Sequence, residues 1–215
     1  MSKTVFSRKL ALVAGVQAIS SMVALPGRLI ESSAPAVFGR LALGFAYFLL
    51  MIAALGYVFS GAVLAGQGRR LGAAARTAGL GFIAGSGLAA LGFLSGLVAV
   101  IANSTLAFKA GLLLVYFAAP LLVAAEALTG LIFLGEADRA RTRAAWGASI
   151  LYIVAPILGV FMNGVGWILA ALIATTIIYV EARGVPEAEA LAGAVTKKLE
   201  QLTGPEETSG EEEKQ

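Results

Sequence analysis

The chain has 215 residues, of which 59% are hydrophobic and 13% are charged, and its mean hydropathy is +0.86. Soluble domains are about 45–50% apolar, so this composition indicates an integral membrane protein with the lipid bilayer as its first partner. The net charge of +3 does not predict nucleic-acid binding, because the Lys and Arg residues gather between apolar segments rather than along one soluble face.

The chain contains no Cys and no His, and its only Asp is Asp138. This excludes disulfides, thiol nucleophiles, iron–sulfur clusters and imidazole ligands for haem, zinc or copper. A Ser nucleophile would lack its usual base. We therefore expect no metal, no cofactor and no enzymatic activity.

The first apolar segment covers about 10–26. Gln17, Ser20 and Ser21 fall on one helical face there, which we expect to point into a helical bundle. Lys3, Arg8 and Lys9 precede the segment, as in a signal peptide. The absence of a clear small-x-small cleavage site favours a first transmembrane helix instead.

The second and third segments cover about 37–66 and 79–102. The third carries a face of small residues that allows helix backbones to approach closely, within the chain or between two copies. These residues are Gly81, Gly85, Gly92 and Gly96. A second interpretation takes 85–87, Gly-Ser-Gly, as a locally unwound stretch whose carbonyls coordinate an ion.

The fourth segment, about 106–135, contains Glu126, the one ionisable residue clearly inside an apolar run. Such residues usually face protein or water and often mark an ion or proton site. Pro120 removes a backbone hydrogen bond and is expected to kink the helix, and Thr129 lies on nearly the same face as Glu126. The alternative is a structural role, in which Glu126 pairs with Arg139 or is protonated.

The last apolar block runs from 145 to 180 and would measure about 54 Å as one helix, beyond a hydrocarbon core of about 30 Å. Asn163 and Gly164 favour a turn at its middle, so we predict two spans, about 146–162 and 165–180. A re-entrant helix shaped by Pro156 is the alternative. Trp167 is expected at the outer membrane interface and Trp146 at the inner one.

Six spans place thirteen of the sixteen Lys and Arg on the inside and leave Arg28, Arg40 and Lys109 outside. Five spans would move the C-terminal tail outside, and the numbers of Lys and Arg on the two sides would then be nearly equal. The sequence thus predicts an all-α polytopic protein of the cell membrane, built from three helical hairpins over residues 1–183, with both termini in the cytoplasm.

A weak repeat relates 60–70 to 129–139. Both stretches read small hydroxyl–Gly–x4–Gly–x3–Arg, at an offset of 69 residues. It indicates either a parallel internal duplication or chance similarity between Gly-rich, Arg-terminated helix ends.

The tail begins after the last span. Its residues 184–204 predict an amphipathic helix with a stripe of Leu and Val. Residues 205–215 are acidic and predict a disordered end.

These features favour two functions. The first is a non-enzymatic membrane component that acts in a homo-oligomer or as an accessory subunit of a membrane-protein partner. The second is a small ion- or proton-coupled transporter or channel that uses Glu126, aided by the polar face around Gln17. A water-accessible cavity that reaches Glu126 would favour transport, whereas a dry, Gly-packed bundle would favour the subunit role.

Overall fold

The computed structural model describes residues 8–33, 35–162 and 164–183, and every regular element in these ranges is a helix. Six helices are long and apolar enough to cross a membrane, which confirms the predicted all-α polytopic class. The predicted tail helix over 184–204 and the acidic end over 205–215 lie outside the described residues. The helices are α1 (Arg8–Ser32), α2 (Pro35–Ala65), α3 (Gly68–Leu71), α4 (Ala73–Ala102), α5 (Thr105–Ala140), α6 (Arg143–Phe161) and α7 (Val165–Ala182).

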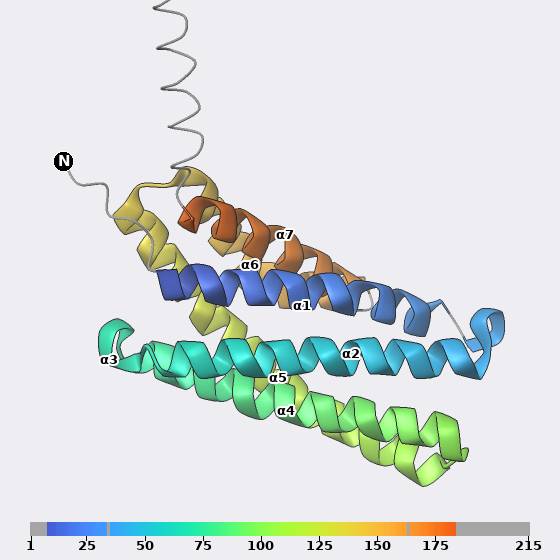
Figure 1. The fold of residues 1–215 in the computed structure, drawn as a ribbon. Helices are drawn as coiled ribbons and strands as arrows, with labels where there is room; N and C mark the ends of the chain where they lie inside the picture. Colours follow the sequence, from blue (N-terminus) through green and yellow to red (C-terminus); the bar gives the residue numbers. More distant parts are fainter. Residues whose placement is uncertain (1–7, 34, 163, 184–215) are drawn as a thin grey trace, which may run out of the picture. The chain divides into compact units, whose positions relative to one another are not determined.

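The six long helices form a closed ring in which each packs against two neighbours, and Figure 1 shows α1, α2 and α4 side by side. The order around the ring is α1, α2, α4, α5, α6 and α7, and α7 returns to α1. The predicted hairpins are α1–α2, α4–α5 and α6–α7. The ends of the helices therefore alternate between two levels, which we name the basic end, with Arg69, Arg76, Arg139 and Arg143, and the cavity end, with Arg28 and Lys109.

The largest core cluster fills the half of the ring nearer the basic end. Phe82, Phe133 and Tyr152 are fully buried there, and the Phe133 and Tyr152 rings meet edge to face at 5.9 Å. Smaller clusters occupy the other half, around Tyr47 and around Ala118. Bulky side chains thus close the bundle at one end only.

The first apolar segment is predicted to end near residue 26, but α1 continues as a helix through Pro26 to Ser32. Proline removes the hydrogen bond to the Met22 carbonyl, and an Arg28–Glu31 ion pair lies in the next turn. The backbone of α2 breaks at Gly39, which has φ +69°, a conformation that costs glycine little. The second membrane span accordingly starts at Gly39.

Short turns join the later helices. Asn103 and Arg141 end α4 and α5 in the left-handed conformation, and the Ser104 hydroxyl caps α5 by accepting from the Ala107 N–H at 3.2 Å. Gly164 has φ +80° and its N–H donates to the Gly159 carbonyl at 2.7 Å. The predicted break between the last two spans is therefore present, although Asn163 lies outside the described residues.

Glycines let α4 approach both of its neighbours. An added Cβ on Gly81 would lie 3.1 Å from the Ala125 Cβ, one on Gly85 would meet Leu122, and one on Gly92 would lie 2.8 Å from the Gly111 carbonyl. On the other side, a Cβ on Gly96 would lie 3.1 Å from the ring of Tyr47 of α2. The small-residue face of this span therefore has its partners within the chain. Helix α4 is continuous through 85–87, which contradicts the interpretation of this stretch as an unwound ion site.

The two halves of the weak repeat occupy comparable places. Gly61 of α2 faces Gly79 and Phe82 of α4, and Gly130 of α5 faces Ser149 and Ile153 of α6. In each case a glycine near the basic end brings a helix close to the next helix of the ring. The contacts are consistent with a duplication of α2–α4 and α5–α6 and equally with convergent packing.

We expect Gly79→Ala to destabilise the bundle by about 1–3 kcal/mol, because its Cβ would lie within 2.7 Å of the backbone of Ala65 and the two helices would have to separate. Gly87→Ala on the same helix meets no atom within 4 Å and should be neutral or slightly stabilising. Unfolding by sodium dodecyl sulfate in mixed micelles measures both. Equal stability of the two variants would contradict this packing.

Candidate functional site

A cavity of about 500 Å³ lies in the half of the bundle nearer the cavity end. Its walls come from α1, α2, α4, α5 and α7 and from the turn at Gly164, and no described residue of α6 lines it. Most lining side chains are apolar or aromatic. The cavity extends from Arg28 and Glu31 at its rim to Glu126 at its floor.

The cavity exists because the α6–α7 hairpin is short. Helices α6 and α7 have 19 and 18 residues, whereas α4 and α5 have 30 and 36. The turn at Gly164 lies beside Arg28, within α1 rather than beyond its end. The longer helices therefore continue past the hairpin (Figure 1), and the cavity lies between them and the turn at Gly164.

Helix α5 adds to this space through its oblique course. Its first half packs on α4, where Ser95 donates to the Ala107 carbonyl at 2.7 Å. Its second half packs on α6, where Gly130 meets Ile153. Tyr116 of the first half both lines the cavity and is 69% exposed at the surface of the bundle.

Glu126 is only 3% exposed, and its Oε2 accepts a hydrogen bond from the indole Nε1 of Trp167 at 2.5 Å. The side chain comes from the middle of α5 and the indole from the first turn of α7. A buried carboxylate requires such a donor, because it has lost its hydration. The bond orients the carboxyl group toward the cavity that both residues line.

Tyrosines from two other helices surround this carboxyl group. Tyr57 of α2 shares a hydrogen bond of 2.8 Å with Ser21 of α1, and Tyr152 of α6 donates to the Gln17 Oε1 at 3.0 Å. Both tyrosines lie close enough to Glu126 to interact with it electrostatically. The structure thus brings Gln17 and Glu126 into one polar layer across the bundle. Gln17 lies outside the cavity, and its Nε2 has no partner among the described residues.

Thr129 and Pro120 stand apart from the site. The Thr129 hydroxyl donates to the Ala125 carbonyl of its own helix at 2.8 Å, a bond that needs no ligand. Pro120 is exposed and does not line the cavity, and α5 continues through it from Thr105 to Ala140.

The glycine face of α4 contributes to the site in part. Gly92 and Gly96 line the cavity, whereas Gly81 and Gly85 lie against α5 below it. Between these pairs Ser86 also lines the cavity, and its hydroxyl has no hydrogen-bond partner within the described part of the chain.

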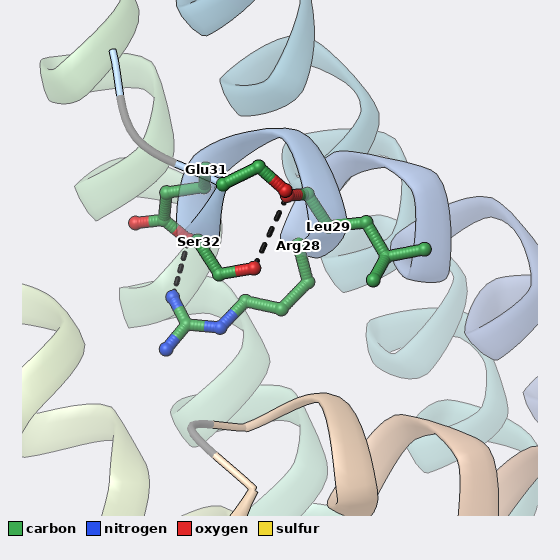
Figure 2. A network of polar contacts seen from close by, with 5 residues as sticks. Arg28, Leu29, Glu31 and Ser32 are labelled. Atoms are coloured by element: carbon green, nitrogen blue, oxygen red, sulfur yellow. Dashed lines mark hydrogen bonds and ion pairs between the residues drawn. The ribbon is translucent and has the colours of Figure 1, made fainter. Parts of the chain in front are cut away.

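An ion pair lies at the rim of the cavity. The Arg28 guanidinium donates to the Glu31 carboxylate one turn further along α1, and Figure 2 shows it beside the α6–α7 turn. Ser33 continues the network by donating to the Leu29 carbonyl at 2.6 Å. The positive charge at the mouth of the cavity is therefore balanced locally.

The described residues contain no group of three or more acidic side chains that could hold a metal ion. No known protein family, curated protein or solved structure matches the chain. Trp167, Tyr57 and Tyr152 are the unexpected members of the site, and the signal for them was a polar aromatic group inside an apolar run, which usually finds a partner when buried.

The bond between Trp167 and Glu126 predicts energetic coupling. Trp167→Phe should cost about 1.5–3 kcal/mol of the free energy of unfolding, because the carboxylate loses its donor. In a Glu126→Leu background the same change should cost about 1 kcal/mol less.

A double-mutant cycle in mixed micelles measures this difference, with Trp146→Phe as the control. Trp146 is half exposed on α6 and does not line the cavity, so its change should stay within about 0.5 kcal/mol. If the losses of unfolding free energy caused by the changes at Trp167 and Glu126 are additive, the bond contributes nothing to stability.

Proposed function

We propose that the protein is a small membrane transporter whose substrate site is the cavity and whose ion- or proton-binding group is Glu126. The observation that supports this best is that the cavity reaches a buried carboxyl group near the middle of the α5 helix. Ionisable residues inside membrane spans usually mark ion or substrate pathways. Substrate sites of transporters commonly lie near the middle of the bilayer.

The positive-inside rule indicates which end of the helical bundle faces the cytoplasm. With both termini in the cytoplasm of a cell, the basic end faces inward and the cavity opens toward the outer side of the cell membrane. We therefore infer an outward-open arrangement, in which Phe82, Phe133 and Tyr152 close the inner half of the path.

A second candidate is the subunit role expected from the Gly-rich composition. It is favoured by α5, which is the least covered of the six spans and carries exposed Leu113 and Phe117 on its surface. A partner or second copy would cover this face. Native mass measurement after mild solubilisation tests it, and a lone monomer without a co-purifying protein would contradict it. Both candidates are non-enzymatic.

The absence of native Cys permits a direct test of transport. Leu122 lines the cavity one turn before Glu126, and Leu151 of α6 is partly buried in the main core cluster. A transporter alternates between outward and inward openings, so Leu122→Cys should react with a membrane-impermeant cationic methanethiosulfonate in both right-side-out and inside-out vesicles. Leu151→Cys should react in neither.

The rate of modification, followed by mass spectrometry, separates the possibilities. Reaction of Leu122→Cys from one side only would contradict transport and indicate a fixed binding site. No reaction from either side would contradict a water-accessible cavity.

A further inference from the structure

We propose that the cavity binds an organic monocation with an apolar or aromatic body, an inference that rests on the transporter proposal and names its substrate class. The structure offers such a molecule three matching features. They are a mostly apolar and aromatic wall, a single uncompensated acidic group at the floor, and an opening on the lipid-facing side of α5.

The wall favours an apolar body. Six aromatic side chains from four helices line the cavity: Tyr47, Tyr57, Phe93, Phe108, Tyr116 and Trp167. Burial of apolar surface stabilises a ligand by about 25 cal/mol per Å², and aromatic faces attract cations when water is excluded. The volume of about 500 Å³ falls in the range of small-molecule sites.

The charges favour a cation. Glu126 is the only acidic side chain at the floor of the cavity, and the indole of Trp167 engages one of its two oxygens. The second oxygen is the one we assign to the ligand. Arg28 lies at the rim, where Glu31 balances it, so it does not neutralise the floor. An anion would have to be desolvated beside Glu126 without a partner, which is costly.

Ser86 supplies a second, independent indication of a ligand. Its side chain is 1% exposed and lines the cavity from α4, yet its hydroxyl has no hydrogen-bond partner among the described residues. Serines in helices usually bond to the carbonyl four residues earlier, as Ser149 does here. A polar group on the ligand would satisfy this hydroxyl.

The opening favours entry from the membrane. Phe108, Leu112 and Tyr116 line the cavity and are also exposed on the surface of α5. An amphipathic cation partitions into the interfacial region of the bilayer, where its apolar body is buried and its charge remains hydrated. It would thus reach the cavity beside the first half of α5.

Trp167 provides the reporter, because Trp146→Phe leaves it as the only tryptophan of the full chain. The purified Trp146→Phe protein in lipid nanodiscs is titrated with tetraphenylphosphonium, with neutral triphenylphosphine oxide and with anionic tetraphenylborate. We expect saturable fluorescence changes with the cation, an affinity for the oxide lower by about tenfold or more, and no saturable change with the borate. Equal affinities for cation and oxide, or a preference for the borate, would overturn the proposal.

The Glu126→Gln variant locates the charge. It should lower the affinity for tetraphenylphosphonium by about tenfold or more and leave the weaker affinity for the oxide within about twofold. Retained oxide binding shows that the cavity is folded, and Glu126→Asp should restore part of the cation affinity. Glu136→Gln on the same helix lies outside the cavity and should change neither affinity.

An unchanged cation affinity in Glu126→Gln would overturn the assignment of the site. This outcome is distinct from failure of transport. Cation binding that depends on Glu126, combined with one-sided modification of Leu122→Cys, would retain the ligand class and reject the transporter. Modification of Leu122→Cys from both sides, without a preference for the cation, would retain the transporter and reject the ligand class.

Discussion

The hydrogen bond from Trp167 to Glu126 is the interaction on which the site depends. It places a carboxyl group of α5 against the first turn of α7, at the level where the ring of helices begins to open. Without a donor, a carboxylate buried among apolar helices would be costly. With this donor, one oxygen is satisfied, and the carboxyl group lines the cavity.

The position of that bond follows from unequal helix lengths. The α6–α7 hairpin ends beside Arg28, while α4 and α5 continue beyond it. Close glycine contacts hold α4 against both α2 and α5, so these longer helices stay together above the hairpin. Large aromatic side chains fill the opposite half of the bundle. The result is a bundle that is packed at its basic end and hollow at the other.

The sequence predicts the six spans well, because runs without charge have few alternatives in a membrane. Boundaries are harder, since Pro26 suggests a helix end, whereas α1 continues through it to Ser32. Glu126 stands out as an ionisable residue in an apolar segment. Its hydrogen-bond donor, Trp167, does not stand out in the sequence, because a tryptophan at this position also fits the aromatic belt at the membrane interface.

The remaining members of the site depend on tertiary packing. Thr129 and Pro120 were grouped with Glu126 by spacing along one helix, yet Thr129 bonds to its own backbone and Pro120 faces away from the cavity. Tyr57 and Tyr152 join the polar layer from other helices, and no pattern along the chain indicates which helices will be neighbours. The closed ring order supplies that information.

The most direct test of the central claim, that the cavity leads to the Glu126 carboxyl group, is its reaction with the apolar reagent N,N′-dicyclohexylcarbodiimide in membranes. Peptide mass spectrometry then locates the N-acylurea adduct. The structure predicts modification at Glu126 that decreases when Ala119 in the cavity wall is replaced by Trp. Absence of an adduct at Glu126, or an adduct that is insensitive to this blockage, would contradict a cavity that reaches it.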